Sequence, residues 1–189
     1  ADLITCRVPF ILRPPKGFDL PTALVDEALH YQFDLAATLL ELLGLLVPQG
    51  WDARGFAGTL KQGKPAGRDA LVLSQMAWSC QRSVRWDKWL LMRTYHSGLK
   101  DLPAYSLFDV MSDPHELNNL ADRYPAVINE GVALLEAWHV GQLAQSPTGP
   151  LDPMQTVLRE GGPFHTRGLE QEYYERLRRT GRASLTGRF

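Results

Sequence analysis

The sequence predicts an α+β fold, in which a small antiparallel sheet of about four strands packs on a C-terminal helix. Three observations lead to this prediction. Four short runs between residues 70 and 110 have strand-like composition, two of them flank a turn at Trp86–Lys88, and a helical pattern follows at residues 125–143. With 189 residues, 44% of them apolar and 22% charged, the chain is long enough to bury such a core.

The first part of the chain predicts one strand and one helix. The apolar run Arg7–Leu12 is followed by prolines and is typical of a short buried strand. Leu35–Leu43 carries leucines at helical spacing, with Asp34 placed for an N-cap and Gly44 placed for a left-handed C-cap. The glycine-rich segment that follows predicts loop, with one helical turn near Leu60.

The middle of the chain supplies the sheet. We expect strands at Ala70–Ser74, Arg82–Arg85, Trp89–Thr94 and Tyr105–Val110. The second and third of these form a hairpin, and the apolar side of the helix at 125–143 packs on the sheet. After Pro147 the chain is rich in Gly, Pro and Arg, and it predicts one further helix at Glu170–Arg179.

Composition excludes several classes of partner. A formal net charge of −1 gives no electrostatic basis for binding nucleic acid or an anionic membrane. No apolar run approaches the roughly 18 residues that a membrane span requires. Cys6 and Cys80 are too few and too far apart for a disulfide framework, so we expect two buried free thiols. We therefore expect neither nucleic acid nor membrane as a partner, and the compartment stays open.

The segment SLFDVMSDPHELNNLAD holds two carboxylates and a histidine within four residues, which suits either a metal or acid/base site or a helix-capping joint. The joint is favoured because Asp113, Pro114 and Glu116 follow the capping-box pattern, in which Glu116 returns a hydrogen bond to the Asp113 amide. Asn119 suits the turn that ends this short helix. Two leucines are expected in the core, Leu117 and Leu120. A metal site would need further ligands, and the sequence names none.

Four segments of the chain carry a family resemblance. RVPFILRPP, FDLAATLLELLGLLVP, RDALVLSQ with RSVRWDKWLLM, and LFDVMSDPHELNNLAD occur in this order between Arg7 and Asp122. Each resembles a segment of the type I sulfatases, members of the alkaline-phosphatase-like superfamily, and the ordered set is more specific than any one segment. The tail segment REGGPFHTRG is also similar to some bacterial sulfatases.

The resemblance implies three regions. Residues 1–65 would be the C-terminal end of the sulfatase α/β core, holding its last strand–helix piece. Residues 66–143 would be the small C-terminal α+β domain, and residues 144–189 a Gly/Pro/Arg-rich tail with one short helix. The chain starts almost directly in a strand-like run and lacks a signal-peptide pattern, so we expect it to be the C-terminal fragment of a longer sulfatase.

The resemblance also implies a chemistry that this chain does not carry. Sulfatases are hydrolases that cleave sulfate esters with a formylglycine made in a C/S-x-P/A-x-R motif, and with a divalent cation, usually calcium. Neither Cys6 nor Cys80 begins such a motif, and the family's metal ligands lie in segments that are absent here. We therefore assign no catalytic residue, metal ligand or cofactor to this chain, and expect Ca²⁺ only in the full-length parent.

We predict that this fragment is inactive alone and shapes the substrate cleft of the parent enzyme. Its expected partners are the missing N-terminal catalytic part and, in the parent, a small sulfate-ester substrate. The uncovered core contacts also favour self-association. Loops of the small domain would supply the rim of the substrate pocket, with the candidates Gln75, Trp78, Arg82 and His96. Each also suits a structural role, in packing or on the solvated surface, and His165 lies in a glycine-rich loop that can approach a ligand.

Two further interpretations stay open. The chain can be an independent α+β interaction domain that docks a partner chain through an exposed apolar face. It can also be a degraded pseudoenzyme. A Ser-His-Asp hydrolase is not supported, because the sequence has no G-x-S-x-G elbow, and it has no phosphate-binding G-x-x-x-x-G-K-[ST] loop either.

Overall fold

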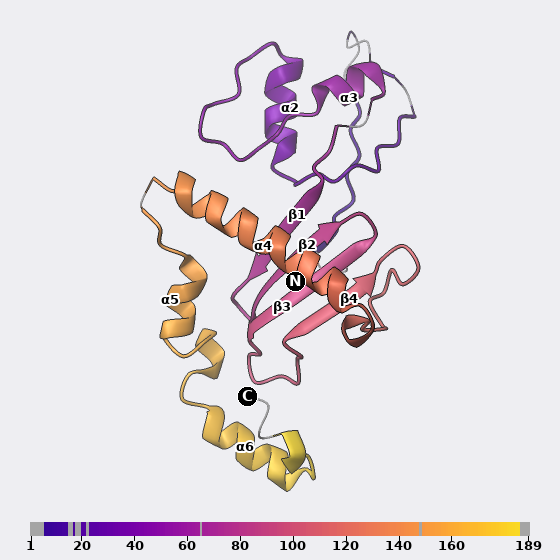
Figure 1. Cartoon of the computed structure of the whole chain (residues 1–189). Helices are drawn as coiled ribbons and strands as arrows, with labels where there is room; N and C mark the ends of the chain where they lie inside the picture. Colours follow the sequence, from indigo (N-terminus) through magenta and orange to yellow (C-terminus); the bar gives the residue numbers. More distant parts are fainter. Residues whose placement is uncertain are drawn as a thin grey trace. The chain divides into compact units, whose positions relative to one another are not determined.

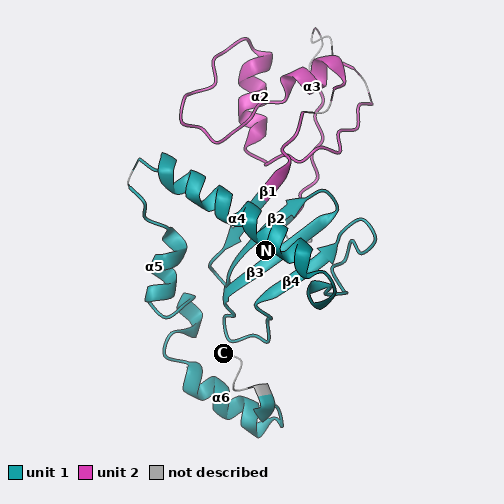
Figure 2. Ribbon diagram, in the orientation of Figure 1, with its two compact units in different colours: residues 1–6, 72–189 teal, residues 7–71 magenta. Residues whose placement is uncertain are grey.

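The computed structural model describes residues 6–14, 17, 20–21, 23–64, 66–147 and 149–185. Their contacts divide the chain into two compact units (Figure 2). We call Arg7–Leu71 the small unit, and the part from Val72 onward, with Cys6, the sheet unit. The region boundaries drawn from the sequence, at residues 65 and 143, stay predictions.

The small unit contains the first predicted helix. Helix α2 spans Asp34–Leu42, so the prediction is confirmed with a shift of one residue, and Asp34 is the first helical residue instead of the cap. The helix ends as expected at Gly44, which has a φ of +71°. The amide of Leu45 donates to the carbonyl of Leu40 at 2.9 Å, which is the long-range bond of a Schellman C-cap.

The predicted strand Arg7–Leu12 is wrong, because the backbone is irregular there. A strand needs a neighbour to pair its N–H and C=O groups, and the β-bridge among the described residues of this unit joins Leu29 to Arg68 instead. Ile11 is 93% exposed, so the run also lacks the burial that its composition predicted. Helix α3, Ala57–Gln62, confirms the predicted helical turn.

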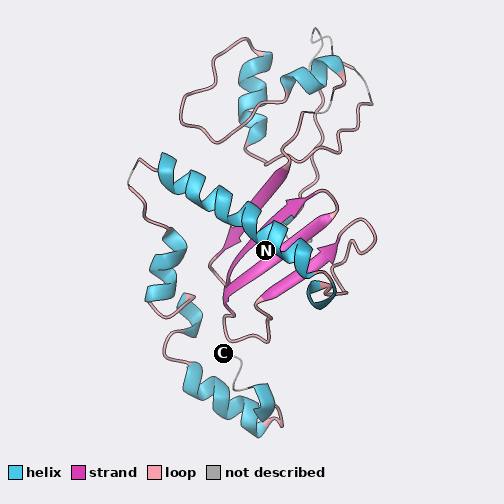
Figure 3. Ribbon diagram, viewed as in Figure 1, coloured by secondary structure: helices cyan, strands magenta, loops and turns pink. Residues whose placement is uncertain are grey.

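Four strands form one sheet, as predicted, and they lie in the order β1-β2-β3-β4 (Figure 3). Their bounds are β1 Ala70–Gln75, β2 Cys80–Trp86, β3 Trp89–His96 and β4 Tyr105–Asp109. Antiparallel pairing of β2 with β3 places Trp86 opposite Trp89, and β3 pairs antiparallel with β4. The hairpin turn holds Asp87 at a φ of +40°, a region that Asp tolerates better than most residues.

Helix α4, Pro125–Gln145, lies across one face of the sheet and confirms the predicted long helix (Figure 1). Close approach depends on Gly131, where a Cβ would lie 2.6 Å from Cδ2 of Leu91. The indole of Trp86 donates to Glu130 at 3.0 Å across the same interface. The core between the helix and the sheet includes side chains with at most 1% exposure, Val84, Leu91, Leu107 and Leu135, whereas Leu90, next to Leu91 on β3, is buried on the opposite face.

The C-terminal segment is more ordered than the sequence indicated. Helix α6, Glu170–Arg179, lies where it was predicted. The expectation of a single helix is wrong, because α5 spans Pro153–Arg159. Asp152 caps α5, accepting the amide of Met154 at 3.0 Å, and Pro153 occupies the first helical position. Met154 is 1% exposed, so this helix is anchored by packing as well.

The segment that connects β4 to α4 forms turns instead of the predicted short helix. Glu116 has a φ of +56°, which is incompatible with a helix. The Asp113 carboxylate accepts the amides of Leu117 at 3.2 Å and Asn118 at 2.8 Å, beyond the positions of a capping box. Leu117 is 79% exposed, so its expected place in the core is wrong. A 3-10 turn, η1, Ala121–Arg123, precedes α4.

Asn119 ties this segment to the sheet. Its side-chain oxygen accepts the amides of Leu107 at 2.9 Å and Ala121 at 3.0 Å. The amide of Leu120 donates to the Leu107 carbonyl at 2.8 Å. These bonds occupy backbone groups of Leu107 along the outer edge of β4, which would otherwise be unpaired.

The two cysteines differ in environment. Cys80 is fully buried at the start of β2, as expected, and burial raises the pKa of its thiol. Cys6 is exposed, so its expected burial is wrong. Among the helices of the described residues, none combines the length and apolar character that crossing a bilayer demands.

Candidate functional site

Two predicted rim residues, Trp78 and His96, lie close to one loop of the C-terminal tail. Trp78 is on the connection from β1 to β2 and is 62% exposed. Its ring centroid lies 5.2 Å from that of His165, and Nζ of Lys100 lies 5.8 Å from the same Trp78 centroid. His96 contacts Gly162 in the tail loop. We call these residues, Trp78, His96, Lys100, Gly162 and His165, the Trp78 cluster.

The β3–β4 loop holds the backbone of Trp78 in place. Gly98 has a φ of +68°, and a Cβ there would lie 1.8 Å from the Trp78 carbonyl oxygen. The Gly98 amide donates to Nδ1 of His96 at 3.0 Å, which fixes that ring nitrogen as an acceptor. Only glycine allows the two loops to approach this closely.

The tail loop is held just as firmly. Gly162 is buried with a φ of +91°, and a Cβ there would lie 2.4 Å from Nε2 of His96. The hydroxyl of Thr166, which is fully buried, donates to the Pro163 carbonyl at 2.7 Å. Nε of Arg167 donates to the Gly162 carbonyl at 3.1 Å. This framework presents Phe164, at 85% exposure, and the neighbouring His165 on the surface.

The Trp78 cluster combines a neutral imidazole with a lysine ammonium group. Burial lowers the pKa of His96, the charge of Glu170 opposes this shift, and the nearby His165 adds to it. His96 is therefore neutral at pH 7, which agrees with its role as an acceptor of the Gly98 amide. Lys100 is exposed beside the Trp78 ring. Indole, imidazole and ammonium groups in this arrangement can stack a ring and bind an anion.

Gln75 lies in a separate network of side-chain amides and hydroxyls. Its Nε2 donates to Oγ of Ser79 at 3.0 Å and to Oε1 of Gln81 at 2.7 Å. Gln81 in turn donates to the hydroxyl of Thr94 at 3.1 Å. The network fixes the chain on both sides of the turn that carries Trp78.

Arg82 lies inside the sheet unit. It is 6% exposed, and its Nη2 donates to Oδ1 of Asp152 at 2.6 Å. Its guanidinium carbon lies 5.6 Å from the Trp138 ring centroid. Nε2 of His139 lies 3.1 Å from the second oxygen of Asp152. The structure thus joins Arg82 to the tail, at a position where its charge is already neutralised.

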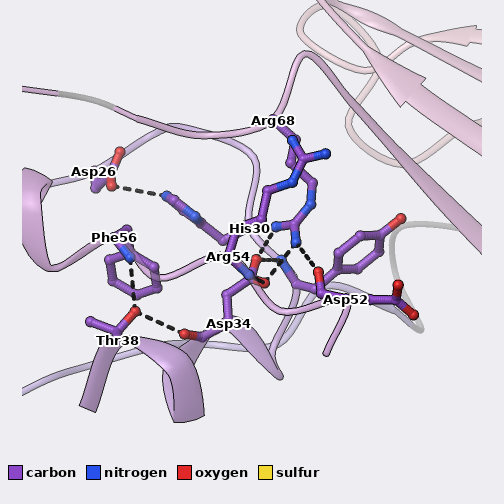
Figure 4. Close-up of polar contacts among 9 residues, drawn as sticks. Asp26, His30, Asp34, Thr38, Asp52, Arg54, Phe56 and Arg68 are labelled. Carbon is purple, nitrogen blue, oxygen red and sulfur yellow. Dashed lines mark hydrogen bonds and ion pairs between the residues drawn. The ribbon is translucent and has the colours of Figure 1, made fainter. Parts of the chain in front are cut away.

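The small unit contains a buried carboxylate, Asp34, whose contacts are shown in Figure 4. Both of its oxygens pair with the guanidinium of Arg68, and they also accept the amides of Tyr31 and Arg54 at 2.8 Å each. Burial raises the pKa of Asp34, but these hydrogen bonds outweigh it and hold the pKa below its usual value. A saturated, ionised carboxylate of this kind stabilises the fold and is poorly suited to proton transfer.

A shallow cavity of about 420 Å³ borders the segment between β4 and α4. It is lined by Lys88, Trp89, Asp109, Ser112, Asp113, Asn118, Leu120, Arg123 and Tyr124. Lys88 pairs with Asp109 at 2.8 Å, and Asp113 bonds the amides that follow it. Because these charges are already used within the chain, this cavity is a weaker candidate than the Trp78 cluster.

A calcium site needs several oxygen ligands that converge on one point. Among the described residues, no group of three or more His, Cys, Asp and Glu side chains converges as an ion would require. The residues present therefore do not fit the calcium ion that the resemblance implies for the parent enzyme, and no chemical step is assigned to a metal here.

Sequence patterns pointed to part of the Trp78 cluster. Trp78 and His96 were predicted rim residues, and His165 was noted in its glycine-rich loop. Lys100 and Gly162 were missed. The sequence held one signal for Gly162, the two adjacent glycines before Pro163. In the structure both have positive φ, and of the two only Gly162 lies against a neighbouring side chain.

Comparison with known proteins agrees with this fold. Residues 4–134 match the family described as N-sulphoglucosamine sulphohydrolase, C-terminal. No curated protein matches the chain. A protein solved in complex with its substrate D-glucosamine-2-N,6-O-disulfate is similar at 21% identity and a TM-score of 0.53, over 60% of this chain and 24% of that one.

A second solved structure shows the same likeness of fold. The protein yidJ from Bacteroides fragilis, assigned as a sulfatase, is similar at 21% identity and a TM-score of 0.50. The match covers 69% of this chain and 27% of that one. The chain thus spans about a quarter of the length of the solved structures that it matches.

Proposed function

Because this chain belongs to the family of C-terminal N-sulphoglucosamine sulphohydrolase domains and is the C-terminal portion of a sulfatase, we propose that it forms part of the rim of a sulfatase substrate pocket. The catalytic groups would lie in the larger remainder of the enzyme. This division is supported by the share of the solved structures that the chain covers, about a quarter of their length.

The Trp78 cluster is the observation that carries this proposal. It gathers residues from the β1–β2 connection, the β3–β4 loop and the tail, and it exposes an indole beside an ammonium group and an imidazole. Binding sites are commonly built from loops that a rigid sheet holds in place. These groups suit recognition of a substrate more than bond cleavage, which fits a supporting role.

We expect the chain to be inactive alone. Cys6 is followed by Arg7-Val8-Pro9 and Cys80 by Gln81-Arg82-Ser83, so neither begins the C/S-x-P/A-x-R motif of the sulfatase nucleophile. Cys80 is also fully buried with a raised thiol pKa, which opposes any nucleophilic role. Calcium and the sulfate ester would be bound by the catalytic part, with this chain completing the pocket.

The proposed partner is the N-terminal catalytic part of the same enzyme. The small unit exposes large apolar side chains that a folded partner would cover, with 93% exposure at Ile11, 79% at Val25 and 94% at Leu46. Burial of such surface supplies about 25 cal/mol per Å² toward association. In the absence of that partner, we expect the chain to self-associate through the same residues.

The inactivity is tested by incubating the purified chain with 4-nitrocatechol sulfate, with and without added Ca²⁺. No release of the catechol above the buffer rate is expected. Turnover by this chain would contradict the proposal that the catalytic groups lie in the remainder of the enzyme.

The rim assignment is tested in the longer enzyme that contains the chain. Trp78→Ala should raise KM for the natural substrate severalfold and change kcat less, since Trp78 is assigned to binding. Trp89→Ala is the matched control, because Trp89 also lies beside a lysine, at 4.7 Å from Nζ of Lys88. If the two variants raise KM equally, Trp78 has no special part in substrate binding and its assignment to the rim of the pocket is wrong.

A second candidate function is an independent interaction domain that docks an unrelated protein chain. The exposed apolar side chains of the small unit favour it as much as they favour a catalytic partner. The genomic reading frame separates the two. A frame that continues upstream of Ala1 with a C-x-P-S-R motif supports the sulfatase fragment, and a start codon just before Ala1 supports the interaction domain.

A further inference from the structure

The C-terminal tail is attached to the sheet unit at two separate points. The first is Asp152, whose Oδ1 lies 2.6 Å from Nη2 of Arg82 on β2 and whose Oδ2 lies 3.1 Å from Nε2 of His139 on α4. The second is Gly162, which is buried against the ring of His96. Helix α5 therefore lies between two fixed points.

Hydrogen bonds close both ends of α5. The helix begins after Asp152, which caps it. It ends in a Schellman motif, in which the Gly162 amide donates to the Val157 carbonyl at 3.0 Å. The preceding amide, of Gly161, donates to the Leu158 carbonyl at 3.1 Å. Because this helix has only seven residues and both of its ends are closed, a displacement of Asp152 would be carried to Gly162.

The loop that follows α5 continues this connection to the Trp78 cluster. In the 3-10 turn η2, Phe164–Thr166, the hydroxyl and the amide of Thr166 both donate to the Pro163 carbonyl, at 2.7 Å and 2.9 Å. This turn places the ring centroid of His165 5.2 Å from that of Trp78. The position of the imidazole is thus set by a hydrogen-bonded segment that starts at the cap of α5.

We propose that Asp152 is a positioning residue for the rim of the pocket. It holds His165 against Trp78 through helix α5 and the loop that follows, although it is not itself a member of the Trp78 cluster. The tail lies beyond residues 4–134, so this positioning belongs to a part of the chain that the family match does not cover. The inference rests on the proposed function for the role of the cluster, but not for the way in which the cluster is held.

A test has to remove the attachment at Asp152 without leaving a buried charge. Asp152→Ser keeps an oxygen that can cap α5, but its side chain is too short to reach Arg82. Combining it with Arg82→Met removes the guanidinium too, because a buried charge without a partner would itself destabilise the chain. We call this pair of substitutions the anchor variant. Asp152→Asn is the conservative variant, since its amide oxygen can still accept from Arg82 and from the Met154 amide.

A second pair of substitutions loosens α5 and leaves the attachment at Asp152 intact. Gln155 and Thr156 are exposed on this helix, so replacing both by glycine weakens the helix without removing a core side chain. We call this pair the helix variant, and it tests the same connection if the anchor variant does not fold. The control is Glu136→Ala, because the pair of Glu136 with Arg93, at 2.6 Å, joins α4 to β3 and does not involve the tail.

The first measurement is made on the chain itself. It is the nuclear Overhauser effect between ring protons of Trp78 and His165, which falls steeply as the two rings separate. This effect should fall severalfold in the anchor variant and in the helix variant, and it should persist in Asp152→Asn and Glu136→Ala. Unchanged amide signals from the β2–β3 hairpin would show that the sheet is still folded.

The second measurement is made in the longer enzyme that contains the chain. The anchor variant should raise KM severalfold, as expected for Trp78→Ala, and change kcat less. Asp152→Asn should recover most of the parent KM, and Glu136→Ala should leave KM unchanged. A purely structural role would instead reduce the amount of folded enzyme, which lowers the apparent kcat and leaves KM in place.

Two results would overturn the positioning role of Asp152. One is a Trp78–His165 effect that keeps its parent strength in the anchor variant or in the helix variant. The other is an equal loss of this effect in Glu136→Ala. Failure of the proposed function would look different, because the effect would still be lost in the anchor variant, while neither that variant nor Trp78→Ala would change KM.

Discussion

Asp152 and Arg82 form a buried ion pair that joins the C-terminal tail to strand β2. Oδ1 of Asp152 lies 2.6 Å from Nη2 of Arg82, and the two side chains are 5% and 8% exposed. The same carboxylate caps helix α5 through the amide of Met154. One side chain therefore fixes both the start of a helix and its attachment to the sheet.

Removing Asp152 should destabilise the chain strongly. Asp152→Ala leaves the Arg82 guanidinium buried without its partner, which costs about 3–5 kcal/mol of unfolding free energy. Urea unfolding followed by tryptophan fluorescence measures this loss. Glu160→Ala is the control, because the pair of Glu160 with Arg167 is half-exposed and is worth about 0–1 kcal/mol. Similar losses in the two variants would contradict the role given to the buried pair.

Stability should fall in acid as Asp152 becomes protonated. Burial raises the pKa of Asp152, but the hydrogen bonds from Arg82 and the Met154 amide hold it below the ordinary value of 3.8. A lowered pKa in the folded state contributes stability above the unfolded pKa, and this is lost as the pH falls through the folded pKa. Unfolding free energy should therefore fall below about pH 4.

The variant Asp152→Asn isolates this carboxyl in the pH series. Its unfolding free energy should be lower than that of the parent at neutral pH, and it should change less with pH in the acid range. If both proteins lose stability in parallel across that range, other carboxyls dominate and Asp152 contributes no measurable linkage. Circular dichroism at each pH supplies the unfolding curves.

Two adjacent glycines in the tail loop, Gly161 and Gly162, allow the cost of backbone strain to be measured apart from the cost of a steric clash. Gly161 and Gly162 have φ values of +88° and +91°, but a Cβ at Gly161 would meet open space, whereas one at Gly162 would lie 2.4 Å from His96. Gly162→Ala should therefore cost about 1–3 kcal/mol more than Gly161→Ala. Thermal unfolding compares them, and adding His96→Ala should recover part of the difference.

Asn119 should matter more than the asparagine before it. Asn119→Ala removes an oxygen that accepts the amides of Leu107 and Ala121, for an expected loss of about 1–2 kcal/mol. The Asn118 side chain makes one long contact with Asp113 at 3.4 Å, so Asn118→Ala should change stability by less than about 0.5 kcal/mol. Urea unfolding measures both losses. If Asn118→Ala lowers the unfolding free energy more than Asn119→Ala does, the hydrogen bonds of Asn119 at the edge of β4 do not supply the expected stability.

Local signals explain which elements could be predicted from the sequence. The hairpin and helices α4 and α6 depend on turn residues and periodicity within a single stretch, and all three lie where they were predicted. The run Arg7–Leu12 has strand-like composition, but a strand also depends on a neighbour that no local pattern specifies. Helix α5 was missed because the cap at Asp152 and Pro153 is surrounded by loop-like composition.

The candidate site was harder to predict than the fold. Trp78 and His165 come from opposite ends of the sheet unit's sequence, so their proximity depends on tertiary packing. Arg82 is the opposite case. Its position on a strand suggested an exposed charge, but in the structure its guanidinium is buried and pairs with Asp152, the residue that caps α5 in the tail. Residue type and spacing thus indicate candidate chemistry, whereas packing decides which groups stay accessible.

The contacts of Asp34 have a consequence for local opening of the small unit. Its carboxylate accepts the amides of Tyr31 and Arg54 and pairs with Arg68, so three separate segments of the small unit share one acceptor. Release of that acceptor would expose both amides to solvent in the same event. Deuterium uptake at Tyr31 and Arg54 should then follow a common protection factor, so that the two loop positions open together although they are far apart in the sequence.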